Sequence, residues 1–106
     1  MCALKGIREL CRAGAEAHAR GDDLNAEFLL RQAHAQAKGL KSPVLEAKIL
    51  NTMAVFALEA SRAAEAVPLL VLARDMVRGR IGQGNRLHTV ISNNLVQAQR
   101  ASNAES

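Results

Sequence analysis

Aromatic residues are almost absent from this chain of 106 residues, which contains two Phe and no Trp or Tyr. It has only two Pro and two Cys, and none of its windows approaches the roughly eighteen apolar residues of a membrane-spanning helix. The core is therefore predicted to consist of small and aliphatic side chains. The length suits one domain with one core and excludes a multidomain enzyme.

The residues that are abundant favour helices. The chain contains 20 Ala and 14 Leu, the best helix formers, while 49% of its residues are hydrophobic and 23% are charged. That balance is typical of a folded globular protein and not of a disordered one. We expect an all-α domain.

The two cysteines, Cys2 and Cys11, lack the spacing of a redox or metal motif, so no disulfide is predicted. Charged residues follow Met1 before any apolar run develops, which is not typical of a signal peptide. We therefore expect a cytoplasmic protein that does not associate with membranes.

Glycine, proline and capping residues divide the chain into five stretches of helical length. Gly21 is expected to end the first helix, Asp22 or Asp23 to cap the second, and Ser42 with Pro43 to start the third. The predicted helices span 3–20, 23–38, 43–60, 63–78 and 86–101.

The chain also repeats itself at an offset of forty residues. Each position in the first set has a counterpart of similar size and polarity in the second. The first set is Leu10, Ala13, Gly14, Ala17, Gly21, Ala26, Leu30 and Ala33; the second is Leu50, Met53, Ala54, Ala57, Ser61, Ala66, Leu70 and Ala73. Small residues at these spacings let two antiparallel helices approach closely, with Leu30 or Leu70 filling the space beyond.

This pattern resembles the tetratricopeptide repeat, in which a helix A with large and small positions is followed by a tight turn and a helix B with Ala, a large residue and Ala. The longer spacing is similar to the variant of kinesin light chains and many bacterial repeat proteins. In that variant helix A often carries Asn-Asn-Leu-Ala, and residues 50–54 and 92–96 look like two versions of it. A generic Ala/Leu-rich five-helix bundle is the alternative.

The resemblance implies a single domain over 1–106, with its helix pairs stacked in a right-handed superhelix. Repeat 1 would span about 3–39 and repeat 2 about 43–79. An unpaired third helix A would span about 86–101, followed by a polar tail over 102–106.

The resemblance also implies a function, because helices A of that family line a concave groove that binds extended peptides. The groove candidates here are Arg8, Arg12, Lys48, Asn51, Val55, Asn93, Gln97 and Arg100. Asn51 and Asn93 are expected to hold a peptide backbone through their amides. The basic members would favour an acidic protein or peptide as partner.

Chemistry-bearing motifs are missing. None of the three His has a partner at the spacing of a helical metal pair, and the capping role of Asp22 and Asp23 accounts for those carboxylates. Gly79, Gly82 and Gly84 follow a helix and lack the Lys-Ser/Thr of a phosphate-binding loop. We expect a non-catalytic interaction module without a metal or cofactor.

Two further expectations concern partners. The formal charge is +4, and a basic segment with Arg74, Arg78, Arg80 and Arg86 supports nucleic-acid binding as the alternative function. The absence of stacking aromatics makes it the less favoured one. An uncovered apolar margin on the last helix would give self-association, with exchange of that helix across the loop 79–85; its candidate residues are Leu87, Val90, Ile91 and Leu95.

Overall fold

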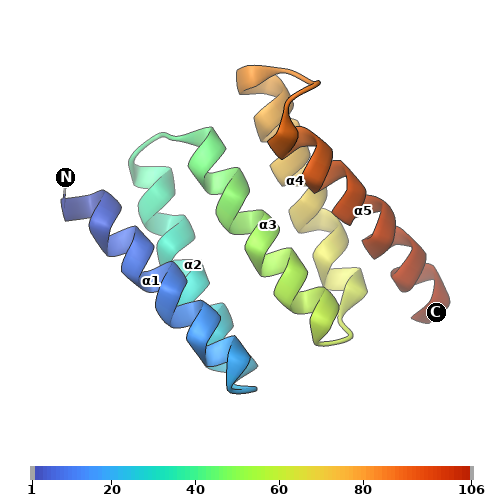
Figure 1. The fold of residues 1–106 in the computed structure, drawn as a ribbon, viewed down its shortest axis with the longest axis horizontal. Coiled ribbons are helices and arrows are strands. Elements are labelled where there is room, and N and C mark those ends of the chain that lie inside the picture. The colour runs from blue at the N-terminus through green and yellow to red at the C-terminus, as the bar shows by residue number, and fades with distance from the viewer. Residues whose placement is uncertain (1, 106) are drawn as a thin grey trace. The chain divides into compact units, whose positions relative to one another are not determined.

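The computed structural model describes residues 2–105, with side chains from Leu4 onward, and its regular elements are all helices. They are α1 (Cys2–Ala19), α2 (Asp23–Gly39), α3 (Pro43–Glu59), α4 (Ala63–Ile81) and α5 (Arg86–Glu105) (Figure 1). The all-α class with five helices is thus confirmed. The helices form two compact units, unit 1 up to Ser42 and unit 2 from Pro43 onward.

Unit 1 is the antiparallel pair of α1 and α2, and small residues bring its helices together. Ala17, Ala26 and Ala33 are all buried. A Cβ atom placed on Gly14 would lie 3.1 Å from Cγ of Leu30, so the glycine permits the close approach that the repeat pattern predicts. A larger residue there would have to displace the buried Leu30 side chain.

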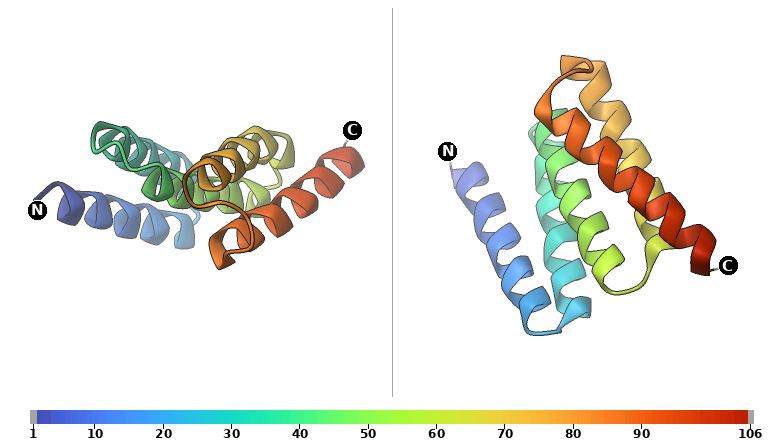
Figure 2. Two further views of the ribbon diagram at one scale, coloured as in Figure 1. Left: turned by 90° about the horizontal axis from the view of Figure 1, so that it is seen from above. Right: turned by 45° about the vertical axis from the view of Figure 1, so that its right-hand side comes forward.

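Unit 2 contains α3, α4 and α5, each antiparallel to the one before it. Figure 2 shows α3 and α5 on the same side of α4. One apolar cluster joins the three helices: Ala47, Leu50, Ala54, Ala57, Ala66, Leu70, Ala73, Val77, Ile91, Leu95 and Ala98. It includes the repeat positions Leu50, Ala54, Ala57, Ala66, Leu70 and Ala73, whose burial is thereby confirmed.

The turns inside the two helix pairs have the same geometry. Gly21 and Ser61, forty residues apart, both have positive φ, of 81° and 61°. In each turn the next residue donates its backbone N–H to an alanine carbonyl five residues back, Asp22 to Ala17 at 2.9 Å and Arg62 to Ala57 at 2.8 Å. Such a left-handed residue closes a helix C-terminus, and glycine adopts that conformation at the lowest cost. Lys41, in the turn between α2 and α3, also has a positive φ, of 54°, so this left-handed closure is shared by three successive turns.

The predicted helix starts at residues 23, 43, 63 and 86 are confirmed, but two of the predicted ends are wrong. Helix α4 continues three residues past 78 because the positive φ that ends it, 80°, falls on Gly82 and not on Gly79. Helix α5 continues through the expected polar tail to Glu105. No Gly or Pro interrupts that segment, so polar residues alone do not stop the helix.

Within residues 2–105, none of the helices combines the length and the apolar character required to span a bilayer.

Candidate functional site

A hydrogen bond between two asparagine side chains joins α3 to α5. Asn94 Nδ2 donates to Asn51 Oδ1 at 2.9 Å, and both side chains are half-buried. The bond fixes the register of the two helices, which run in the same direction on one side of α4 (Figure 1). We call the surface around it the α3–α5 face; it comprises Lys48, Asn51 and Val55 of α3 and Arg86, Val90, Asn94 and Gln97 of α5.

The amide pair leaves two polar groups without a partner. A primary amide carries two donor hydrogens and one acceptor oxygen. The bond uses one hydrogen of Asn94 and the oxygen of Asn51, and neither side chain has another hydrogen bond to the described residues. The Nδ2 group of Asn51 and the Oδ1 atom of Asn94 are therefore available to a ligand, as a donor and an acceptor from adjacent side chains.

The α5 side chain that contacts Asn51 is that of Asn94, whereas the side chain of Asn93, the groove candidate expected to hold a peptide, is exposed. The reason is geometric. Equivalent positions on successive helices point in the same direction, so they do not face each other. Asn94, the next residue, lies about 100° further around α5, and its side chain reaches Asn51.

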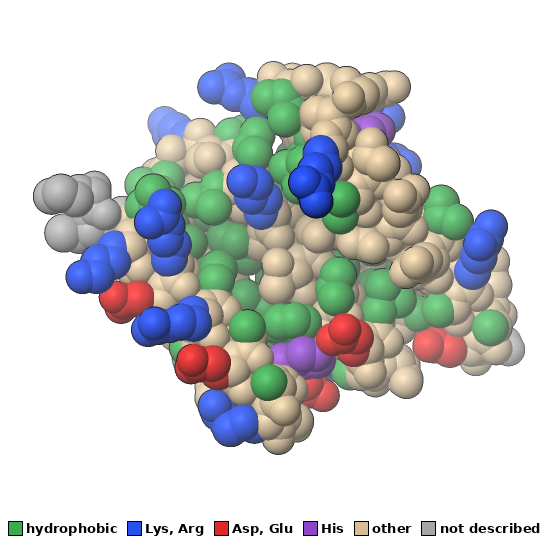
Figure 3. Space-filling model, viewed as in Figure 1, with side chains coloured by type: hydrophobic (Ala, Val, Ile, Leu, Met, Phe, Trp, Pro, Cys, Tyr) green, Lys and Arg blue, Asp and Glu red, His purple; other side chains and the backbone are tan. Residues whose placement is uncertain are grey.

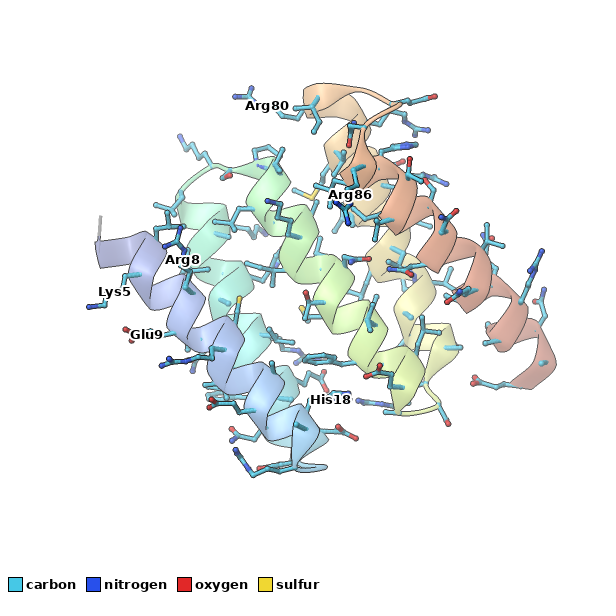
Figure 4. All side chains as sticks on the ribbon, in the orientation of Figure 1. Lys5, Arg8, Glu9, His18, Arg80 and Arg86 are labelled. Atoms are coloured by element: carbon cyan, nitrogen blue, oxygen red, sulfur yellow. The ribbon has the colours of Figure 1, made fainter. Side chains whose placement is uncertain are left out.

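The other groove candidates are divided between the units. Lys48 is exposed and Val55 half-buried on α3, while Gln97 and Arg100 are exposed on α5. Arg8 and Arg12 are exposed on α1, in unit 1, and Figure 4 shows Arg8 on the surface of that helix.

Positive charge marks the end of the α3–α5 face at which both helices begin. Lys48 and Arg86 are exposed, and neither forms an ion pair with the described residues. Figure 4 shows that Arg86 leaves the start of α5 on the side facing α3. In Figure 3, Lys and Arg side chains lie over the beginnings of these helices.

The basic segment between Arg74 and Arg86 does not form one surface. Arg74 and Arg78 contact the same oxygen of Asp75, at 3.2 and 2.7 Å. Arg80 points away from α5 at the end of α4, whereas Arg86 points toward α3 (Figure 4). Arg80 and Arg86 therefore do not present their charges in the same direction.

Three of the four residues proposed for self-association lie in the core of unit 2 or against it. Ile91 and Leu95 are 0% and 4% exposed, and Leu87 packs against the same core. Of the four proposed self-association residues only Val90, at 39%, is classed as exposed. An apolar margin on α5 is left at Val90 and Val96, which is 44% exposed, and self-association through it stays a prediction.

Other titratable residues have local structural roles. His18 Nδ1 lies 2.9 Å from Asp23 Oδ1, which links the end of α1 to the start of α2. Asp22 is the N-cap of α2 and accepts the backbone N–H of Asn25 at 3.3 Å. Among the residues that the structure describes, no three His, Cys, Asp or Glu side chains are grouped as metal ligands would be.

Cys11 provides a test of local burial. Burial raises the pKa of its thiol, so a smaller fraction is thiolate near neutral pH and reaction with alkylating agents slows. In a Cys2→Ser variant at about pH 8, we expect iodoacetamide to modify Cys11 more slowly than in the same protein unfolded in urea. Mass spectrometry over time measures both rates, and equal rates would contradict the expectation.

Comparisons with known proteins give no match to a family model, a curated protein or a solved structure. The likeness to tetratricopeptide repeats therefore rests on residues of this chain, namely the small core positions and the paired turns at Gly21 and Ser61.

Proposed function

We propose that this chain is a non-catalytic, tetratricopeptide-like interaction module that binds an extended peptide, or an extended segment of a partner protein, on the α3–α5 face. The observation that carries the proposal is the amide pair of Asn51 and Asn94, with one donor and one acceptor left available. An extended peptide presents the complementary groups, since each residue offers a carbonyl acceptor and an N–H donor.

The repeat supports the proposal because it explains why two polar side chains meet at this place. In helical arrays each helix pair contacts its neighbours, and curvature of the stack exposes an extended concave surface. Helices α1, α3 and α5 take the A positions of such an array, and the proposal includes the right-handed superhelix of that family. We propose further that the partner is a protein and that the two proteins meet in the cytoplasm.

The test begins with a peptide selected for binding from a random nonapeptide library. We expect Asn51→Ala and Asn94→Ala each to weaken its binding by about two- to tenfold, because each removes a hydrogen bond worth roughly 0.5–1.5 kcal/mol. Fluorescence anisotropy of the labelled peptide measures Kd, and circular dichroism checks that helicity is unchanged.

Gln99→Ala is the matched control. Gln99 is an exposed amide on the same helix, five residues from Asn94 and therefore about 140° around it. We expect wild-type affinity from this variant. Full-strength binding by the Asn51→Ala, Asn94→Ala double variant would remove the amide pair from the site.

A further inference from the structure

The two cations at the beginning of the α3–α5 face are not held by carboxylates of the residues that the structure describes, and Glu46, in the first turn of α3, is buried. Lys48 and Arg86 form no ion pair with described residues, whereas Arg62 and Arg78 lie 3.6 and 2.7 Å from the carboxylates of Glu65 and Asp75. The first turn of α5, where Arg86 stands, contains no acidic residue. A ligand that crosses this end of the face must therefore supply the negative charge itself.

The two cations lie a short distance from the amide pair, measured along the axes of α3 and α5. Lys48 precedes Asn51 by three residues, which is about 4.5 Å along α3, and Arg86 precedes Asn94 by eight, which is about 12 Å along α5. An extended peptide advances roughly 3.3–3.6 Å per residue. A side chain one to four residues from the peptide group held by the amides would thus reach Lys48 or Arg86.

From these positions we infer that the ligand is an extended peptide with an acidic side chain one to four residues from the amide pair, held between Lys48 and Arg86. The inference rests on the proposed function, because it assumes that the amide pair holds a peptide backbone. The inference adds two properties of the ligand. The ligand carries an acidic residue, and that residue lies toward the beginnings of α3 and α5. A protein segment is favoured over a nucleic acid because only two cations meet here and the described residues of the face include no aromatic side chain for a base.

The probes are two series of nonapeptides in a Ser-Ala background, one with a single Glu at each position in turn and one with Gln in its place. Titration of the isotope-labelled protein is followed by NMR at the side-chain amides of Asn51 and Asn94 and at Nε–H of Arg86. We expect both series to shift the asparagine signals. Only Glu peptides should shift Arg86, and the best of them should bind about two- to tenfold more tightly than its Gln counterpart, as exposed ion pairs allow.

Lys48→Gln and Arg86→Gln should each reduce the preference for Glu over Gln, measured for each variant as the ratio of the two dissociation constants. Arg80→Gln is the matched control, since it removes the same charge from an exposed position of unit 2 that points away from α5 (Figure 4). Screening over about 8 Å at physiological salt keeps its effect small.

The outcomes separate the inference from the function on which it rests. Equal binding of Glu and Gln peptides, with the asparagine signals shifted by both, would overturn the acidic site and leave the peptide-binding proposal intact. Absence of any shift at Asn51 and Asn94 would overturn both. An effect of Arg80→Gln equal to that of Arg86→Gln, or displacement of the peptides by an oligothymidylate at physiological salt, would also overturn the acidic peptide site.

Discussion

Replacing Leu95 by Glu is expected to lower the free energy of unfolding by about 3 kcal/mol or more. Leu95 is 4% exposed and lies in the cluster that joins α3, α4 and α5. The substitution removes buried apolar contacts and places a carboxylate where the cluster offers it no polar partner. Since domains of this size are stable by only about 5–15 kcal/mol, the loss is a large part of the total.

Val96→Glu is the control for that experiment. Val96 is the next residue along the helix and is 44% exposed, so its replacement should change stability by no more than about 0.5 kcal/mol. Urea unfolding followed by circular dichroism compares the two variants with the wild type. If Leu95→Glu remained as stable as Val96→Glu, Leu95 would not belong to the core.

Light scattering of the same proteins tests the self-association expected from the sequence. A surface contact through Leu95 would make Leu95→Glu a well-folded protein of smaller mass. The buried position instead predicts loss of structure.

The position of α5 shows why its surface could not be predicted from the apolar residues alone. When α3 and α5 are aligned so that Asn51 matches Asn93, each α3 residue that contacts α4 has a counterpart on α5. These counterparts are Thr89, Ser92, Val96 and Gln99. Three of these four are polar, so α5 does not continue the helix-pair pattern. Its buried residues Ile91, Leu95 and Ala98 lie on the side that contacts the preceding helix, α4.

Much of the fold could be predicted because the signals are local. Pro43 at the first position of α3 and the cap of α2 at Asp22 depend on a few neighbouring residues, and the small positions of the helix pairs recur at one offset. Helix ends were less predictable, because Gly79 and Gly82 are equally suited to a left-handed turn. Hydrogen bonds from Asn85 select the later one: its Nδ2 donates to the Gly82 carbonyl at 2.8 Å, and its Oδ1 accepts from the backbone N–H of His88 at 2.8 Å.

Only part of the candidate site could be predicted. Asn51 is on the face expected for it, but the partner amide and the second cation, Asn94 and Arg86, depend on how α5 is rotated against α3. A repeat offset identifies equivalent residues, and contacts between successive helices join non-equivalent ones. Moving one residue along α5 from the equivalent of Asn51 would have identified Asn94.

The second large effect is expected at Ala66, the buried small residue of α4. Its side chain is 0% exposed and lies in the same cluster as Ala54 and Leu70. Ala66→Leu adds three carbon atoms at a place where α3 and α4 are in close contact, so the helices must separate or adopt strained side-chain conformations. We expect the free energy of unfolding to fall by about 1–3 kcal/mol.

Two matched variants make this a test of the repeat and not of alanine burial in general. Ala64 is exposed on the same helix, so Ala64→Leu should change stability by less than about 0.5 kcal/mol. Ala26 is the equivalent of Ala66 in unit 1 and is 2% exposed, so Ala26→Leu should destabilise its own helix pair to a similar extent. Thermal unfolding of the three variants measures the pattern. Loss of stability in the Ala26 and Ala66 variants but not in the Ala64 variant would support the repeat pattern, and equal losses in all three would contradict it.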